Sequence, residues 1–405
     1  MKTFYLKRID SIIFIIFSSI MIFSCTNNVA HIKNVNQGKM KGTYSLAVNG
    51  EKKFLLDDNT ATKPPYIQLI EDSGKRILSF YNPYKNAIYF FDYETTEYYK
   101  NISYYRQGPN AISRIGAYFA VTSDSIYILD SHLMRINLSN NSGIIKQKYP
   151  LIPSFDPKSR DYSWALYYPQ YTIQTFNPII KYENKLFLPG LAPFSVDDSI
   201  IDRFRFMTCF DINNHTIKYF HTYPAELYGN NISWNSHIYT QAYTEITDDG
   251  YFIISFPVSH NLYTVKWDEE KYETIYGGSN NAKTITSINC EFGMPTDNKL
   301  INNYFKNDLY SAIIYDPWRK IYYRFFSKRK PDATVETPIN EKEYGVVIMD
   351  ENFQYLGETI IGNETTWNFA NSFVTVEGLN IEYMDFSEDS EEEFLRFKIF
   401  ILKQL

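Results

Sequence analysis

Six short polar turns recur along this sequence at intervals of about 50 to 70 residues, and a recurring interval of this kind marks repeat architectures. Each turn lies between two runs of strand-forming residues. The turns are Asp72-Ser73-Gly74, Thr122-Ser123-Asp124, Glu183-Asn184, Asp248-Asp249-Gly250, Asp316-Pro317-Trp318 and Glu377-Gly378. Glycine tolerates positive φ angles, and Asp, Asn and Ser side chains bond to their own backbone, so such turns favour tight hairpins. The sequence therefore predicts a chain of similar β units.

A second hairpin follows the first in most units, which gives each unit four strands. In the first unit, for example, residues 87–92 and 98–102 form this second pair, and in the fifth unit residues 346–350 and 354–360 do so. The composition agrees, because Tyr and Phe favour strands and number 36 and 30 among 405 residues. Four-stranded antiparallel units repeated around an axis are the blades of a β-propeller.

The two ends of the predicted ring complement each other. The sixth unit supplies three strands between residues 373 and 402, while residues 43–48 form a spare strand near the start. If this strand completes the sixth unit, two exposed sheet edges disappear. We therefore predict an all-β, six-bladed propeller, with seven blades or two β domains as alternatives. Because no interior stretch has the composition of a linker, residues 43–405 are expected to form a single domain.

The first residues have the features of an export signal. Lys2, Lys7 and Arg8 precede an apolar run over residues 11–23, which is shorter than the about 20 residues that span a bilayer. The following Ile22-Phe23-Ser24-Cys25 resembles a bacterial lipobox. This resemblance implies that residues 1–24 are a lipoprotein signal peptide and that Cys25 is lipidated, with residues 25–42 as the anchor and a polar tether. An ordinary cleaved signal, with Cys25 incidental, is the alternative.

The whole arrangement resembles a known group of proteins. A lipobox followed by about six blades, with Arg106-Gln107-Gly108-Pro109-Asn110 after the first, is similar to the six-bladed propeller lipoproteins of Bacteroidetes. The resemblance implies a cell-envelope location, as an outer-membrane lipoprotein held by its lipid. Surface-exported lipoproteins often carry acidic residues beside the lipidated cysteine, and their absence here favours the side facing the periplasm. The family is largely uncharacterised, so the resemblance implies no catalytic residues and no cofactor.

The charge of the chain excludes one class of partner. The net charge is −6, and removal of the signal would make it more negative, so the protein should repel phosphate backbones and bind no nucleic acid. Besides Cys25 the chain has Cys209 and Cys290. These two could pair in an oxidising compartment. Alternatively Cys209, which lies in an apolar strand pattern, is a buried free thiol.

The long loops are expected to gather on one face of the disc. In a four-stranded blade, the first and third turns lie on one face, whereas the second turn and the connection to the next blade lie on the other. All the long segments belong to this second face, namely residues 103–114, 150–177, 189–204, 223–240, 277–308, 327–344 and 361–370. Loops longer than about 12–15 residues are uncommon unless they are functional or disordered. We therefore expect a ligand-binding face there.

Aromatic and amide side chains in these loops are the candidates for that role, because flat rings supply area and polar neighbours supply direction to a glycan or peptide. The candidate ligand-binding residues are Arg106, Asn110, Arg114, Trp164, Tyr167, Tyr168, Trp234 and His237. The alternative interpretation is that the aromatic residues fold the loops onto the disc. On that view the arginines make salt bridges or stack on tyrosines, and His237 is an ordinary loop residue.

Sequence motifs for catalysis are absent. The chain has no HExxH, no GxSxG, no phosphate-binding glycine loop and no EF-hand loop, and Glu245 and Glu377 form no recurring set of inward carboxylates. We interpret the acidic run at residues 388–393 as a solvated hairpin tip rather than a Ca²⁺ site. The sequence thus favours a lipid-anchored binding module for a glycan, peptide or protein, without catalysis or cofactor. The alternatives are an envelope assembly partner and a metal-dependent propeller hydrolase or lyase.

Overall fold

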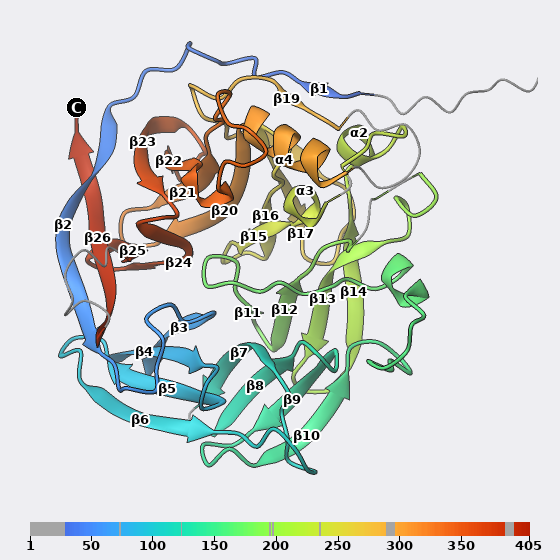
Figure 1. Cartoon of the computed structure of the whole chain (residues 1–405), viewed down its shortest axis with the longest axis vertical. Helices are drawn as coiled ribbons and strands as arrows, with labels where there is room; N and C mark the ends of the chain where they lie inside the picture. Colours follow the sequence, from blue (N-terminus) through green and yellow to red (C-terminus); the bar gives the residue numbers. More distant parts are fainter. Residues whose placement is uncertain are drawn as a thin grey trace, which may run out of the picture.

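The computed structural model describes residues 29–72, 74–122, 124–193, 196, 198–234, 236–288, 296–384 and 393–405. The predicted signal peptide, Cys25, Cys290 and most of the acidic run 388–393 lie outside these ranges, and the expectations about them stay predictions. Six four-stranded antiparallel sheets are arranged around a common centre, as Figure 1 shows. The predicted six-bladed β-propeller is therefore confirmed.

Five of the blades are each built from four consecutive strands, ordered from the centre outwards. Blade one holds β3 (Ile67–Asp72), β4 (Lys75–Asn82), β5 (Ala87–Asp92) and β6 (Tyr98–Ser103). Blade two holds β7 (Ile115–Thr122), β8 (Ser125–Asp130), β9 (Arg135–Ser139) and β10 (Ile145–Pro150). Blade three holds β11 (Ile180–Tyr182), β12 (Lys185–Pro189), β13 (Arg205–Asp211) and β14 (Ile217–Thr222). Blade four holds β15 (Tyr243–Ile246), β16 (Tyr251–Ser255), β17 (Asn261–Lys266) and β18 (Glu273–Tyr276). Blade five holds β20 (Leu309–Asp316), β21 (Ile321–Ser327), β22 (Glu343–Asp350) and β23 (Tyr355–Asn363).

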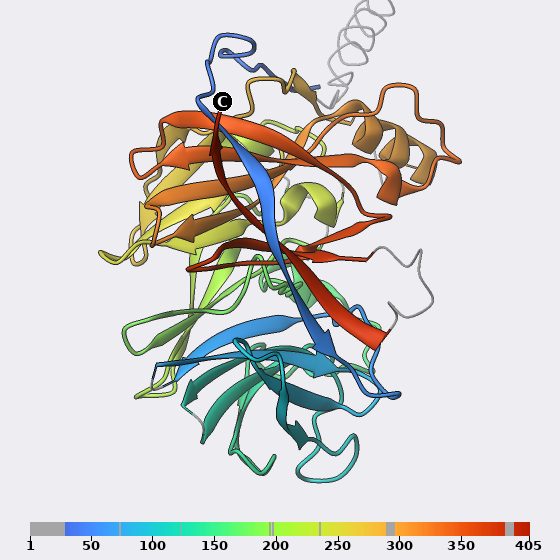
Figure 2. The same ribbon diagram turned by 90° about the vertical axis from the view of Figure 1, so that its left-hand side faces the viewer.

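The sixth blade closes the ring as predicted. It consists of β24 (Trp367–Thr375), β25 (Gly378–Tyr383) and β26 (Phe394–Gln404), with β2 (Tyr44–Leu55) added at its outer edge. β2 pairs with β26 in antiparallel register, from Tyr44 opposite Gln404 to Leu55 opposite Phe394. In Figure 2 the blue strand β2 crosses the red strand β26 on the side of the disc. The closing strand is thus longer than the expected residues 43–48.

The six predicted turns each join the first strand of a blade to its second. Gly250 in blade four has a φ of +83°, a conformation that glycine adopts without steric cost. The core lies between neighbouring blades and is largely aromatic. Between blades six and one, Phe54 packs edge-on against Phe91 and Phe397, with ring centroids 5.8 and 6.1 Å apart. Burial of such rings accounts for the unusual number of aromatic residues.

Short helices appear in the long segments, where the sequence predicted only loops. They are the 3₁₀ helices η1 (Ser163–Leu166) and η2 (Ile339–Glu341) and the α-helices α2 (Ala225–Tyr228), α3 (His237–Thr240) and α4 (Asp297–Lys306). All but α4 have three or four residues, too few to show a helical period in the sequence. None of the helices in the described part of the chain is long and apolar enough to cross a membrane.

Part of the expected tether is docked on the propeller. Strand β1 (His31–Ile32) pairs with β19 (Ile285–Thr286) in the connection between blades four and five. The Asn34 side chain donates hydrogen bonds to the carbonyls of Ser279 and Ala282, at 2.8 and 2.7 Å. Residues 29–42 therefore lie against the disc, near α4 (Figure 1). We call this segment the strap.

The centre of the ring is filled by residues 175–177, at the end of the connection between blades two and three. Thr175 Oγ1 accepts a hydrogen bond from the Ile67 backbone of blade one and donates one to Asn371 of blade six, at 2.9 and 2.8 Å. Asn177 Oδ1 accepts a hydrogen bond of 3.0 Å from the Thr244 backbone of blade four. Three blades thus hold this segment, which we call the plug.

Candidate functional site

Three of the predicted ligand-binding residues line one hollow. Trp164, Tyr167 and Tyr168 surround a cavity of about 360 Å³ in the connection between β10 and β11, on the face with the long loops. Phe155 and Asp156 complete its wall from the preceding part of the same connection. We call this cavity the aromatic hollow. It brings together ring faces and acidic oxygen atoms within one segment of chain.

Each ring of the hollow is held by a neighbouring side chain. Trp164 packs edge-on against Phe155, with ring centroids 5.5 Å apart. Tyr168 packs in the same way against Tyr219 of blade three, at 5.4 Å. Tyr167 is half exposed, and the guanidinium carbon of Arg203 lies 5.0 Å from its ring centroid. Because packing fixes the rings before a ligand arrives, little side-chain entropy would be lost on binding.

Asp161 organises the start of η1. Its carboxylate accepts a hydrogen bond of 2.9 Å from the Ser163 backbone. Hydrogen bonds from the Ser163 backbone and hydroxyl hold the pKa of Asp161 below its usual value, so this carboxylate is ionised at neutral pH. Carboxylates next to exposed rings can accept hydrogen bonds from the hydroxyls of a sugar whose apolar face rests on a ring.

The other predicted aromatic residue has a different environment. Trp234 is only 1% exposed, its indole N–H donates to the Leu227 carbonyl at 2.7 Å, and its ring packs 5.4 Å from Tyr239. A ligand on the surface cannot reach this side chain, which instead fastens the loop to the disc.

His237 begins α3 and is exposed. Asn235, which the same segment contains, lies outside the described residues.

The predicted polar residues of the 103–114 connection are all exposed and lie apart from the aromatic hollow. Arg106 donates a hydrogen bond to the Pro83 carbonyl. Burial raises the pKa of Tyr81, and the positive charges of Arg106 and Arg114 offset part of this rise, so both arginines approach the same hydroxyl. Asn110 lies in the same exposed connection. The two arginines are thus brought together, without lining a described cavity.

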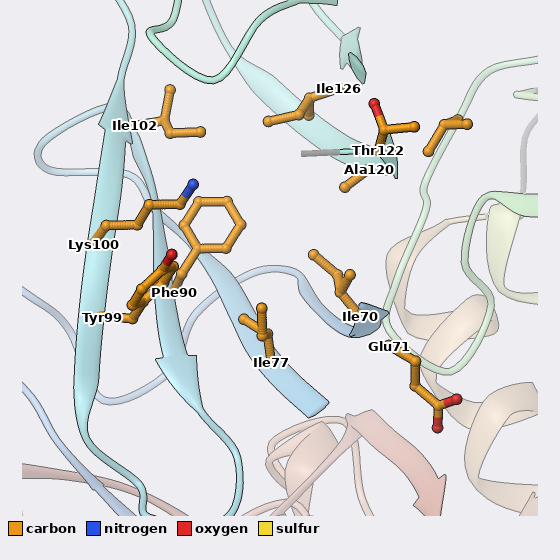
Figure 3. Close-up of a pocket in the computed structure, with 11 residues that line it drawn as sticks. Ile70, Glu71, Ile77, Phe90, Tyr99, Lys100, Ile102, Ala120, Thr122 and Ile126 are labelled. Atoms are coloured by element: carbon orange, nitrogen blue, oxygen red, sulfur yellow. The ribbon is translucent and has the colours of Figure 1, made fainter. Parts of the chain in front are cut away.

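A cleft between blades one and two was not visible in the sequence. It has a volume of about 260 Å³ and is lined mainly by apolar side chains from six strands, β3 to β8. Figure 3 shows Lys100 reaching over Phe90, whereas Glu71 points away from the apolar walls. The Lys100 ammonium lies 5.2 Å from the Phe90 ring centroid. The cleft arises where two twisted sheets diverge, a feature that no local sequence pattern encodes.

The centre of the propeller holds a further cavity, between the plug and the face with the short turns. It measures about 250 Å³, and Glu245 lies in its wall. The other candidate inward carboxylate, Glu377, accepts two hydrogen bonds of 2.6 Å from Arg76. Although burial opposes ionisation of Glu377, these bonds lower its pKa to about 2. Within the described ranges, no three His, Cys, Asp or Glu side chains are placed to hold a metal ion.

The Cys209 thiol is free and buried in β13, and burial raises its pKa to about 12, so it is unreactive at neutral pH. Cys290, the other cysteine of the predicted pair, lies outside the described residues.

Comparison with known proteins adds a family. A family model described as "Domain of unknown function (DUF4221)" matches residues 43–360. Among solved structures, a DUF4221 member from Bacteroides vulgatus is similar, with 20% identity and a TM-score of 0.71 over 94% of this chain and 100% of that chain. A protein of Bacteroides fragilis assigned as exported has 12% identity and a TM-score of 0.50, over 89% and 95% of the two chains. At these identities the similarity shows the fold alone. No curated protein matches.

Proposed function

This chain belongs to the DUF4221 family, and we propose that it is a lipid-anchored binding protein of the cell envelope that recognises a glycan on its long-loop face. The observation that carries this proposal is the aromatic hollow. Three side chains chosen from sequence as ligand contacts, Trp164, Tyr167 and Tyr168, line the same cavity. Aromatic anchors at the centre of a contact surface contribute much of the binding energy in protein complexes.

The chemistry of the hollow favours a carbohydrate over an anionic ligand. The charged residues that line it are the carboxylates Asp156 and Asp161. The Arg203 guanidinium is engaged on the Tyr167 ring, with its carbon 5.0 Å from the ring centroid. Arg106 and Arg114 lie elsewhere. Carboxylate oxygen atoms accept hydrogen bonds from sugar hydroxyls and repel phosphates and carboxylates. The exposed Tyr167 ring offers a flat surface for the apolar face of a pyranose. A peptide would use the same ring and is the other outcome of the test.

The lipid anchor rests on the lipobox-like Ile22-Phe23-Ser24-Cys25. The strap follows this segment closely, since Ala30 already donates a backbone hydrogen bond of 2.9 Å to Ser287 Oγ. An anchor at Cys25 would therefore hold the propeller close to the bilayer. The similar Bacteroides fragilis protein, which is assigned as exported, fits an envelope location. Mass spectrometry of the protein purified from membranes tests whether Cys25 carries a lipid, with Cys25→Ser as the control.

Binding can be tested on arrays of glycans and of peptides with the purified protein. We expect saturable binding to a group of related glycans and at least about tenfold weaker binding by Tyr167→Ala, the loss typical of an aromatic anchor. Tyr162→Ala is the matched control, because Tyr162 is 61% exposed but does not line the hollow. Binding to neither array, or equal losses in both variants, would rule out this site.

An assembly role is the second candidate, favoured by exposed aromatic side chains near blade one. Tyr98, Tyr99 and Tyr105 are 50%, 63% and 73% exposed. Aromatic residues are enriched where proteins bind each other. Crosslinking in intact membranes, followed by purification of the protein, would give a stable protein partner under this alternative and none under the first.

A further inference from the structure

The cavity at the centre of the short-turn face is a second candidate site, on the opposite side of the disc from the aromatic hollow. The plug forms its floor through Thr175 and Phe176, together with the adjoining Pro178. Its walls come from residues at or beside the innermost strands of blades three to six. We call it the channel cavity. With about 250 Å³, it has room for several water molecules or for one small organic molecule.

Glu245 supplies the negative charge of the channel cavity. Its two carboxylate oxygens accept backbone hydrogen bonds of 3.0 Å, one from Ile246 and one from Tyr315. No salt bridge to Glu245 is present in the described part of the chain. Burial raises the pKa of Glu245 to about 7, so that about half of the population is ionised at neutral pH. The carboxylate is therefore held in place by backbone groups, without a salt bridge to another described residue.

Arg319, which follows Trp318 of the cavity wall, already has hydrogen-bond partners. Arg319 donates a hydrogen bond of 2.9 Å to Asp316 Oδ2, and another of 2.9 Å to the Val376 carbonyl of blade six. The charged groups that act on Tyr315 and Tyr322, next to Glu245, include the carboxylates of Asp248, Asp249, Asp316 and Glu351. These carboxylates favour positive charge at this end of the channel.

The remaining surface of the channel cavity provides a second polar group and apolar walls. Thr244 is buried and lines the cavity, and its hydroxyl has no hydrogen-bond partner among the described residues. A buried hydroxyl without a partner is destabilising, so a bound molecule or water that pairs with it is favoured. Tyr315 and Trp318 form an aromatic side of the cavity, with Trp318 45% exposed.

We propose that the channel cavity binds a small molecule with an ammonium group on an apolar body, the ammonium contacting Glu245 and the body packing against Tyr315 and Trp318. Side chains of consecutive strand residues project to opposite sides, so Thr244 meets a different part of the ligand from Glu245. The aromatic rings add a cation–π attraction. This site goes beyond the glycan-binding role and does not depend on it.

The proposal is tested by titration calorimetry of the whole protein with benzylamine and its neutral isostere benzyl alcohol. We expect saturable binding of benzylamine at pH 8 and at least about tenfold weaker binding of benzyl alcohol. Binding of the amine should weaken as the pH falls from 8 to 6, because a proton then competes for Glu245. Glu245→Gln should lose the preference for the amine and this pH dependence. Glu183→Gln, an exposed turn residue of blade three, is the matched control and should behave as the wild type.

The comparison of benzylamine with benzyl alcohol uses the wild-type protein, so the test stays valid even if Glu245→Gln fails to fold. Absence of saturable benzylamine binding at pH 8, or equal affinity for the alcohol, would overturn the proposal. So would unchanged amine binding by a folded Glu245→Gln. Loss of glycan binding by Tyr167→Ala is measured at a different cavity, so the two proposals can fail separately.

Discussion

Single buried polar residues hold the blades of this propeller together. Arg324 of β21 is fully buried and donates hydrogen bonds to blade four, including 3.0 Å to Ser255 Oγ and 2.8 Å to the Ser259 carbonyl. Its guanidinium carbon lies 3.9 Å from the ring centroid of Tyr310. Guanidinium presents five N–H donors in one plane, which allows one side chain to satisfy several carbonyls of a turn.

Replacing Arg324 should therefore be costly. We expect Arg324→Leu to reduce the free energy of unfolding by about 3 kcal/mol or more, because several buried acceptors lose their donors. Urea denaturation followed by tryptophan fluorescence measures the loss. Lys320→Ala, at an exposed position of the blade-five turn, should change stability by less than about 0.5 kcal/mol. Similar stabilities of the two variants would contradict this role.

Glu382 should make stability depend on pH. Asn368 donates a hydrogen bond of 2.7 Å to its carboxylate, yet burial raises its pKa to about 8. The folded state therefore binds this proton more tightly than the unfolded state between about pH 4.5 and 8. Its contribution to stability is complete at low pH and is lost as the pH rises through this window.

The isosteric variant Glu382→Gln removes that titration. Its free energy of unfolding relative to the wild type should increase between pH 5 and 8, by about 1.4 kcal/mol per pH unit at most. Urea denaturation at several pH values measures the difference. A constant difference across this range would show that Glu382 does not titrate in this way.

Residue roles were only partly visible in the sequence. Trp164 and Trp234 both follow a serine in an aromatic loop, and no local pattern distinguishes the roles of the two side chains. Their difference comes from the Leu227 carbonyl, which the fold places beside the Trp234 indole. Likewise, nothing marks residues 175–177 as a plug, because their partners lie in blades one, four and six. Contacts of such long range require the assembled ring.

At the scale of elements, the blades could be predicted because turn chemistry and strand propensity agree in each unit. The sequence analysis did not predict the contact between β2 and β23, which we call the seam. The Thr43 backbone donates a hydrogen bond of 2.8 Å to the Leu356 carbonyl, and a Cβ atom on Gly357 would clash with the Tyr44 carbonyl. A glycine is needed at this position because two backbones approach closely.

Gly357→Ala should loosen this seam. We expect a loss of about 2 kcal/mol, since the backbone of β2 or β23 must move to admit the methyl group. Hydrogen exchange of Gly357→Ala should show that the amides of β2 lose more protection, relative to the wild type, than the amides of the other strands. Gly50→Ala is the control within β2, because a Cβ there would make only ordinary contacts with Ile399. Unchanged protection of β2 in Gly357→Ala would contradict the close packing.

For the whole molecule, stability depends on the pairing of β2 with β26. Removing residues 394–405 would leave β2 and β25 with unpaired edges, and such edges promote association. We expect this variant to aggregate or unfold without cooperativity, as measured by size-exclusion chromatography and thermal melting. Removal of residues 403–405, which are exposed, should leave a cooperatively folded monomer. A monomeric, cooperative protein lacking residues 394–405 would show that closure is dispensable.

The pairing of β2 with β26 also has a consequence during biosynthesis. Residues 44–55 are synthesised well before their partners at residues 394–404. At about 5–20 residues per second, the early segment waits on the order of tens of seconds. Throughout that time its hydrogen-bonding groups remain available to other chains. A cell that makes this protein must therefore keep the nascent polypeptide shielded until residues 394–404 have been synthesised.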